Sequence, residues 1–309
     1  MRRSYLFFLC AAALLLAPRT GRAWDATGHM LVDYVASRQL KPGVEEKIEA
    51  LAHRIDTKYN DHLLYNIVTV GCLMDDMRSE PHYPYGSLHY VDVPYTPTAS
   101  PFTVPDPPNI LSAIDDAIAT LKKAGVSEAD RALATAMVMH FVGDIHQPLH
   151  CVDWNDKGGN GYVIYGVPFS DLGPRQLANL HTYWDKAFRF DAKDGKIFEV
   201  YKGPGKPQER PKNPDEGIIK EEGDRIMAQF PPESLWELQL NTTPRTWAEE
   251  SYTIACLFAY PIGPHPTDVE AVTIKPDYSH HAHDIACQRI ALAGYRLGDL
   301  LNQLFANTP

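Results

Sequence analysis

The sequence predicts a mostly α-helical chain that forms a single domain with long loops. Apolar residues recur at helical spacing in several segments, which is typical of amphipathic helices. Alternating patterns typical of strands are scarce, and no segment repeats another. With 309 residues, of which 44% are hydrophobic, the chain is long enough to bury one sizeable core.

The helical pattern is clearest in the middle of the chain and near its end. Leu111, Ile114 and Ile118 follow one another at intervals of three and four residues, and Met137 and Phe141 continue a second such stripe. The last helix has the longest apolar stripe. The predicted helices cover residues 25–39, 111–123, 128–143, 174–190, 245–258 and about 280–305.

Two segments between these helices are expected to be loops. Residues 94–108 contain six prolines, which exclude a continuous helix. Residues 191–216 are rich in glycine, proline and charge, as in a surface insertion. A weak strand signal predicts a short β-hairpin near residues 160–167, directly after the Gly158-Gly159 pair.

The first 23 residues have the pattern of a cleaved signal peptide. Arg2 and Arg3 precede an uncharged apolar run of 13 residues, and Gly21 and Ala23 place small residues before the predicted cleavage point. An N-terminal membrane anchor is the alternative, but the run is short for a bilayer span. We therefore expect a secreted protein, or one in the lumen of the secretory and endocytic pathway. Its single domain of residues 24–309 would contain no transmembrane segment.

The charge of the processed chain is strongly negative. Removing the first 23 residues takes away four arginines and no acid, which leaves 25 basic against 39 acidic residues and a formal charge of −14. Such a chain lacks the basic surface expected of a protein that binds a phosphate backbone. Either nucleic acid is not the substrate, or bound metal ions supply the positive charge.

Export also bears on the cysteines and on glycosylation. An oxidising compartment permits disulfide bonds, and the four cysteines of the processed chain allow three full pairings, among which the sequence does not choose. These cysteines are Cys72, Cys151, Cys256 and Cys287. The sequon at Asn241 predicts one surface glycan if the host glycosylates.

Histidine and aspartate recur at a spacing that suits a metal site. His140 and Asp144 are four residues apart in a predicted helix, and His181 and Asp185 repeat the spacing in another, so each pair shares one helix face. One such pair is more often a surface hydrogen bond. Two pairs without thiolates favour catalytic zinc, with further candidate ligands at Asp75, His89 and His150.

The segment His140-Phe-Val-Gly-Asp144-Ile-His-Gln-Pro-Leu-His150 resembles the central motif of the S1/P1 nuclease family. Other segments resemble the family's motifs and follow in the family's order. They are Trp24-Asp-Ala-Thr-Gly-His29, Met74-Asp75-Asp-Met-Arg78, Leu88-His89-Tyr90-Val-Asp92, Gly158-Gly159-Asn160, Asn179-Leu-His181-Thr-Tyr-Trp184-Asp185 and Ala293-Gly294-Tyr-Arg296-Leu297. The family's usual Trp-Ala before the aspartate is Leu73-Met74 here, which affects local packing and not the ligand.

The resemblance implies an all-α fold, shared with bacterial zinc phospholipase C, that holds three zinc ions. One zinc ion would be bound by Asp75, His89, His140 and Asp144, and a second by His150, His181 and Asp185. The third would be bound by His29, by a bridging Asp144, and by the amine and carbonyl of Trp24. Trp24 has a free α-amine only after the signal peptide has been removed, so it can be a ligand only then. To bind a metal, this amine must also lose its proton.

The resemblance also implies an activity: cleavage of single-stranded DNA and RNA to 5′-phosphorylated products, and removal of 3′-phosphate from 3′-nucleotides. We expect the secreted enzyme to be a monomer. Asp75 would orient the attacking water, and Arg78 and Asn160 would stabilise charge in the transition state. Tyr90 would stack on a base and Asp92 would contact its edge. Two alternatives stay open: a zinc-dependent phospholipase C, and a secreted zinc-binding protein without catalysis.

Overall fold

The computed structural model describes residues 24–55, 65–80, 82–165, 178–189, 215–240, 242–260 and 271–306. Its α-helices are α1 (Ala26–Ser37), α2 (Val44–Ala52), α3 (Leu73–Asp76), α4 (Ile110–Lys122), α5 (Glu128–Asp144), α6 (Leu180–Trp184), α7 (Glu216–Gln229), α8 (Glu237–Leu240), α9 (Pro244–Ile254) and α10 (Pro276–Phe305). Short 3₁₀ helices are η2 (Val70–Cys72), η3 (Met77–Ser79), η4 (Gly86–His89), η5 (Pro148–Cys151), η6 (Ala187–Arg189) and η7 (Pro232–Ser234), and η8 (Ala255–Ala259) is π-helical. The mostly α prediction is confirmed.

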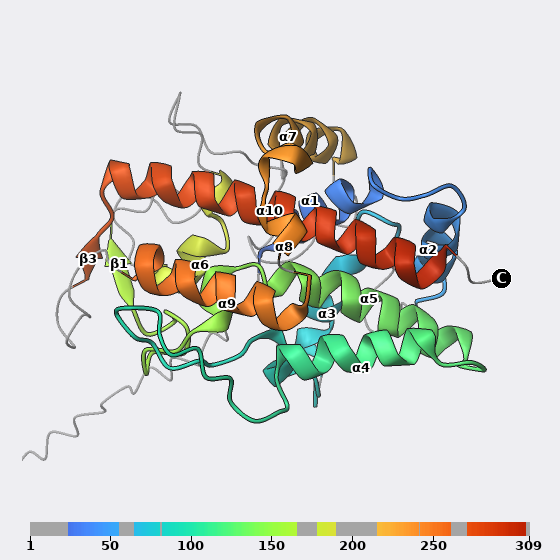
Figure 1. The fold of residues 1–309 in the computed structure, drawn as a ribbon, viewed down its shortest axis with the longest axis horizontal. Coiled ribbons are helices and arrows are strands. Elements are labelled where there is room, and N and C mark those ends of the chain that lie inside the picture. Colours follow the sequence, from blue (N-terminus) through green and yellow to red (C-terminus); the bar gives the residue numbers. More distant parts are fainter. Residues whose placement is uncertain are drawn as a thin grey trace, which may run out of the picture.

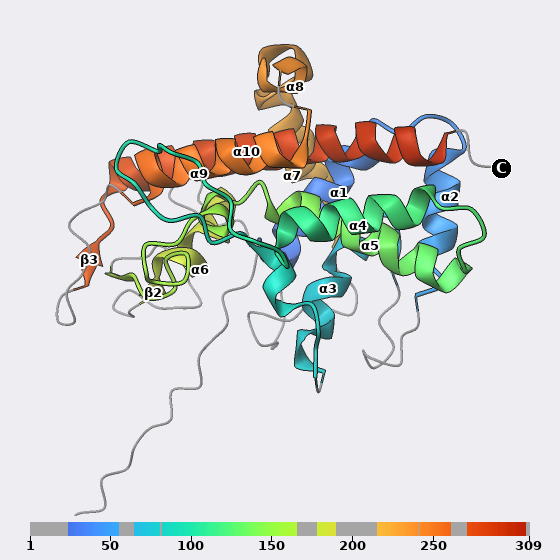
Figure 2. The same ribbon diagram turned by 60° about the horizontal axis from the view of Figure 1, so that its bottom comes forward.

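The helices are arranged around α10, which runs along the length of the molecule (Figure 1). Helix α1 packs against both α10 and α5, which also contact each other, and α4 packs along α5 (Figure 2). Helix α7 covers α1, and α9 packs against η5. This arrangement brings the N-terminal helix, the end of α5 and η5 together in the centre of the molecule.

Local signals in the sequence explain where these helices begin. Asn109 caps α4 and forms a reciprocal capping box with Ser112, and the Ser127 hydroxyl accepts a hydrogen bond from the Asp130 N–H at the start of α5. Thr243 caps α9 in the same way, with Pro244 at the first helical position. The predicted positions of these helices, of α1 and of α10 are therefore confirmed.

The helix predicted over residues 174–190 is wrong in extent. Helix α6 begins only at Leu180, because the Asn179 side chain caps it by accepting from the Thr182 N–H. Residues 178–179 instead form strand β2 (Ala178–Asn179). Four more α-helices, α2, α3, α7 and α8, lie where no helix was predicted.

The predicted hairpin is only partly right. Strand β1 (Val163–Tyr165) lies in the expected segment, but its antiparallel partner is the distant β2, with Val163 opposite Asn179. Strand β3 (Val272–Thr273) pairs in parallel with the other edge of β1, so the sheet order is β2-β1-β3. A weak local pattern could not reveal pairing between segments so far apart in the chain.

The expectation of disulfide bonds is wrong for the described chain, where no disulfide joins the four cysteines. All four are buried, and three have thiols beside groups in different parts of the core. The Cys72 thiol contacts the Ala26 carbonyl, the Cys151 thiol contacts the Ile145 carbonyl, and the Cys287 thiol lies 3.6 Å from His283 Nε2.

Several predictions fall outside the described residues. They are the signal peptide at 1–23, the sequon asparagine Asn241 and nearly all of the loop at 191–216. Residues 94–108 are described and contain no helix, as predicted. In the part of the chain that was searched, no helix is both long and apolar enough to cross a membrane.

A buried ion-pair network ties the end of α5 to α9 and α10. Glu250 of α9 accepts hydrogen bonds from Arg289 at 2.7 Å and from Arg296 at 2.8 Å, and both arginines lie on α10. Arg289 Nε also donates to the His146 carbonyl, and Arg296 Nη1 contacts His146 Nε2 at 2.8 Å. These contacts fix the residues that follow α5, where candidate metal ligands lie.

The close approach of α1 and α10 depends on a glycine. A Cβ atom built on Gly294 would lie 2.4 Å from Val35 Cβ, which is far inside van der Waals contact. Neither side has room to move, because Val35 and the residues around Gly294 are buried. Glycine is therefore required at this crossing for steric reasons.

We predict that Gly294→Ala lowers the free energy of unfolding by about 1–3 kcal/mol, because the added methyl group overpacks the α1–α10 contact. Chemical denaturation measures the change. Gly86→Ala is the matched control, since a Cβ there meets no atom within 4 Å. Equal stability of the two variants would contradict the packing argument.

Candidate metal centre

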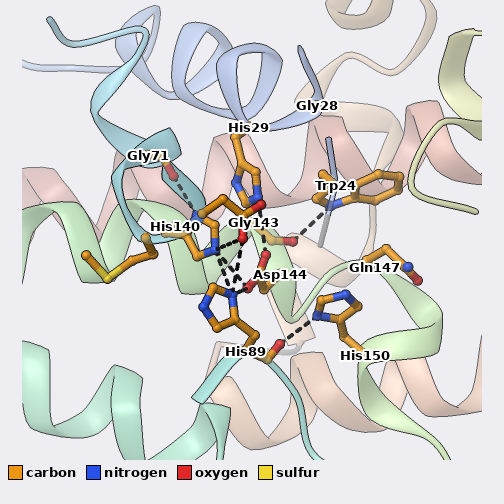
Figure 3. Close-up of polar contacts among 12 residues, drawn as sticks. Trp24, Gly28, His29, Gly71, His89, His140, Gly143, Asp144, Gln147 and His150 are labelled. Atoms are coloured by element: carbon orange, nitrogen blue, oxygen red, sulfur yellow. Dashed lines mark hydrogen bonds and ion pairs between the residues drawn. The ribbon is translucent and has the colours of Figure 1, made fainter. Parts of the chain in front are cut away.

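Six segments of the chain supply the predicted side-chain ligands, and Figure 3 shows how His29, His89, His140, Asp144 and His150 lie near one another. His140 and Asp144 come from the last turns of α5, and His89 ends η4. The other predicted ligands come from α1, α3, η5 and α6, and they are His29, Asp75, His150, His181 and Asp185. All of these side chains are buried, although their segments are far apart in the sequence.

Three groups of these side chains are compact enough to hold a metal ion. In each group, the potential ligand atoms all lie within 4.8 Å of one another. The groups are His89 with His140 and Asp144, His150 with His181 and Asp185, and His29 with Asp75 and His140. The second group has the same residues as one ligand set implied by the resemblance. The first has three of the four residues of another set, and Asp75 falls instead in the group of His29 and His140.

The first group contains nitrogen atoms that are too close together without a positive charge. His89 Nδ1 and His140 Nε2 lie 2.9 Å apart, and each is within 3.1 Å of Asp144 Oδ2. The outer nitrogen of His140, Nδ1, lies 2.6 Å from the Gly71 carbonyl oxygen. Because a carbonyl only accepts, Nδ1 carries the proton, and in the neutral ring Nε2 presents a lone pair.

The same reasoning applies to His89. The Tyr83 hydroxyl donates to the Met74 carbonyl at 2.7 Å, so it accepts from His89 Nε2 at 2.8 Å. Burial, together with the nearby Arg78, lowers the pKa of His89 to about 3, so the ring is neutral at ordinary pH. His89 Nδ1 therefore also presents a lone pair, and a cation between it and His140 removes the repulsion.

The second group repeats this arrangement. His150 Nδ1 donates to the His89 carbonyl at 2.6 Å, and His181 Nδ1 donates to the Gly158 carbonyl at 2.7 Å. Their Nε2 atoms face each other at 3.2 Å, and His181 Nε2 lies 3.7 Å from Asp185 Oδ1. Burial raises the pKa of Asp185 well above its ordinary value, and a bound cation would favour its charged form.

The donor sets therefore fit a metal such as zinc. Imidazole nitrogens and carboxylate oxygens are its usual ligands in catalytic sites, and the outer imidazole nitrogens donate to carbonyl or hydroxyl groups, as they do around bound metals. Gln147 completes the second group by donating to Asp185 Oδ1 at 2.7 Å. The protein thus fixes both the tautomer and the orientation of His89, His140, His150 and His181.

His29 and Trp24 lie on the α1 side of these groups. The His29 ring stacks on His140 with 4.0 Å between centroids, and its Nε2 lies 3.3 Å from Asp144 Oδ1. A Cβ on Gly143 would lie 3.0 Å from His29 Nδ1, so glycine makes room for the ring. Trp24 is buried, and its indole N–H donates to the Gly143 carbonyl at 2.9 Å. This contact holds the predicted new N-terminus beside the metal ligands.

Asp75 and Arg78 lie next to each other at the edge of the site. Arg78 Nε is 3.0 Å from Asp75 Oδ1, which in turn lies 3.9 Å from both His89 Nδ1 and His140 Nε2. Burial alone raises the pKa of Asp75, but Arg78 and the imidazoles lower it to about 2. The carboxylate is therefore ionised at neutral pH.

The other predicted site residues lie around these groups. The Asn160 amide donates to the Lys157 carbonyl at 2.8 Å, while its oxygen is buried and accepts no hydrogen bond within the described chain. Tyr90 is 38% exposed, and Asp92 is also exposed. Burial and the neighbouring Asp153 raise the pKa of Asp92 to about 6. No direct contact joins Asn160, Tyr90 or Asp92 to the metal-ligand groups in the described chain.

Two outer residues of the site were not predicted, Tyr83 and Gly71. Each contacts the outer nitrogen of one imidazole, and neither has a sequence spacing that would reveal this role. Gln147 stands in the central motif, but its contact with Asp185 was not foreseen. Such partners are defined by the fold and not by a local pattern.

We predict that Tyr83→Phe weakens zinc binding about 10–100-fold, because His89 loses the acceptor that fixes its tautomer. Competition with a chromogenic chelator measures the affinity. Tyr85→Phe is the control, since its ring packs 5.4 Å from that of Tyr83 and its hydroxyl makes no hydrogen bond to His89 in the described chain. Unchanged zinc affinity in Tyr83→Phe would refute this role of the hydroxyl.

Comparison with known proteins agrees with the site. Residues 24–306 match the sequence model of the S1/P1 nuclease family. The chain is 24% identical to Endonuclease 1 of Arabidopsis thaliana over 98% of this chain and 93% of the relative. It is 28% identical to Nuclease S1 of Aspergillus oryzae over 97% and 98% of the two chains, and 22% identical to Nuclease P1 of Penicillium citrinum over 91% and 97%. The chain belongs to the S1/P1 nuclease family.

Proposed function

We propose that this protein is a secreted zinc-dependent endonuclease that hydrolyses phosphodiester bonds in single-stranded DNA and RNA. The products would carry 5′-phosphates, and 3′-nucleotides would lose their phosphate. One observation carries the proposal: the three groups of buried imidazoles and carboxylates, whose nitrogen lone pairs converge on the same spaces. The names of its relatives, which include Endonuclease 1 and Nuclease S1, support the reaction class.

The proposed zinc ligands are the sets that the family resemblance implies, and each set shares residues with one of the three groups. His89, His140, Asp144 and Asp75 would hold one ion, His150, His181 and Asp185 a second, and His29, Asp144 and the backbone of Trp24 a third. When bound, zinc lowers the pKa of a coordinated water and neutralises charge on phosphate oxygens. Three divalent ions would also offset the acidity of the chain where the phosphate binds.

The chain's own residues would then position the substrate and the attacking water. The ionised Asp75 accepts a proton or a hydrogen bond from a water molecule beside it, and it holds the Arg78 guanidinium at 3.0 Å. Arg78 is a fixed cation at the edge of the site, suited to the charge that develops on the phosphate oxygens. The Asn160 amide is the other candidate for this contact.

The preference for single strands would come from Tyr90 and Asp92. Tyr90 follows the ligand His89 directly and is exposed, so a base can stack on its ring. The Val91 N–H donates to the His150 carbonyl at 2.8 Å, which fixes this segment beside the second metal group. A duplex hides its bases from such a surface, whereas an unpaired strand does not.

Processing would complete the site. We propose that cleavage after residue 23 frees the Trp24 amine and leaves residues 24–309 as one catalytic domain that acts as a monomer. A preceding residue would convert this amine into a peptide N–H and so remove the ligand. The free amine binds zinc by losing its proton. Export of the chain is consistent with a role outside the cytosol.

Removal of the metal tests the proposal most simply. We expect a strong chelator to abolish cleavage of single-stranded DNA, and added zinc to restore it. His181→Ala should lower the zinc content and reduce cleavage by about a hundredfold or more, since a bound ion contributes several kcal/mol to the transition state.

The control for that substitution is His53→Ala, because the His53 side chain is 61% exposed and, among the described residues, its ion pair is with the surface Glu49. Cleavage that survives complete zinc removal would refute the metal dependence. Zinc binding without cleavage of any nucleic acid, followed by hydrolysis of phosphatidylcholine, would replace the nuclease with a phospholipase C. Zinc binding with neither activity would leave a metal-binding protein.

Substitution of Tyr90 tests the substrate contact separately. We predict that Tyr90→Ala weakens binding of single-stranded DNA by about 1–3 kcal/mol, the contribution of one stacked base. Tyr90→Phe retains the ring and should bind nearly as well. Steady-state kinetics on single-stranded oligonucleotides measure the change in KM. Equal KM values for the alanine and wild-type enzymes would remove Tyr90 from the substrate site.

A further inference from the structure

A buried carboxylate lies behind the metal centre without belonging to any of the three ligand groups. Asp33 lies on α1 one turn after His29, and its side chain is fully buried. An isolated buried carboxylate is costly unless hydrogen bonds or positive charge compensate it. Burial raises the pKa of Asp33 well above its ordinary value. Such a residue in a core calls for an explanation beyond packing.

One oxygen of Asp33 has a defined partner. Asp33 Oδ2 accepts a hydrogen bond from the Gly71 N–H at 2.8 Å, and Oδ1 is buried and accepts none in the described chain. Gly71 lies in the middle of η2, between α1 and α5. The carboxylate on α1 therefore binds the backbone N–H of a residue in a different segment, η2.

Gly71 is also the residue that fixes His140. Its carbonyl accepts the Nδ1 proton of His140 at 2.6 Å (Figure 3). A side chain cannot be added at this position, since a Cβ on Gly71 would lie 2.6 Å from Asp33 Oδ2. The Gly71 backbone is thus held on one side by the carboxylate and contacts the ligand imidazole on the other.

We propose that Asp33 is a positioning residue for the metal centre: through Gly71 it sets the orientation and tautomer of His140, whose Nε2 faces the metal. This inference rests on the proposed zinc site. The N–H and the carbonyl of Gly71 belong to successive peptide groups, so a tilt of the first peptide group displaces the second. Loss of the Asp33 acceptor would free η2 to move, and the hydrogen bond to His140 would lengthen.

Zinc affinity separates this role from a purely structural one. If Asp33 only tied α1 to η2, its loss would destabilise the zinc-free and the zinc-loaded forms alike and leave zinc affinity unchanged. If it positions His140, its loss weakens zinc binding. Outer partners of metal-bound histidines typically contribute about 10–100-fold in affinity, and we expect the lower end, about tenfold, for a residue one step further out.

The experiment compares Asp33→Leu with Asp33→Asn in the full processed protein. Zinc affinity is measured by chelator competition, and the Nδ1 proton of His140 is followed by NMR in ¹⁵N-histidine-labelled, zinc-loaded protein. Asp33→Leu removes the acceptor and should weaken zinc binding about tenfold and broaden or shift this proton. Asp33→Asn keeps an oxygen that accepts from Gly71 and should stay close to the wild type in both measurements.

Thr135→Val is the matched control, because Thr135 is equally buried on α5 and bonds only to the Arg131 carbonyl, away from the ligands. It should change stability without changing zinc affinity. If Asp33→Leu does not fold, Gly71→Ala perturbs the same contact from the other side and should also weaken zinc binding.

Three outcomes would contradict the inference. Wild-type zinc affinity in Asp33→Leu overturns it while leaving the zinc site intact. Equal weakening in Asp33→Leu and Asp33→Asn overturns the hydrogen-bond route, since the asparagine retains the acceptor. A wild-type protein that binds no zinc would overturn the proposed function as well. Measuring zinc binding of the wild type and of His181→Ala in parallel distinguishes this outcome from failure of the inference alone.

Discussion

Two imidazole nitrogens, His89 Nδ1 and His140 Nε2, lie 2.9 Å apart beside the buried Asp144 carboxylate, and in the neutral tautomers that their outer contacts select both present lone pairs. Acceptor groups this close repel one another in a medium of low polarity. A bound cation turns the repulsion into attraction. The surrounding structure can be understood as a scaffold that holds these acceptors in place until the cation arrives.

The scaffold is built from segments that meet only in the folded chain. Carbonyls of Gly71, His89 and Gly158 accept the outer protons of three imidazoles, and Tyr83 does so for a fourth. The Glu250 network fixes the chain after α5. Strong negative charge on the whole chain then favours metal binding, and the metal in turn supplies the local positive charge that an acidic nuclease otherwise lacks.

The sequence predicted the fold class, the main helices and a set of ligands that the structure brings together. Those features depend on local spacing: His140 and Asp144 share a helix face wherever that helix packs. The sequence did not reveal the partner of β1 or the late start of α6, because both depend on distant pairing and on one cap at Asn179. The disulfide expectation failed because an oxidising compartment permits bonds but does not bring thiols together.

The most direct test of the account is X-ray diffraction from crystals of the processed protein, recorded on both sides of the zinc absorption edge. We expect three anomalous peaks: one among His89, His140 and Asp144, one among His150, His181 and Asp185, and one beside His29 and Asp144. The peak between His89 and His140 is the decisive one, because the shortest nitrogen contact lies there. Zinc-loaded crystals that show no peak between these two rings would contradict the central claim that a cation joins them.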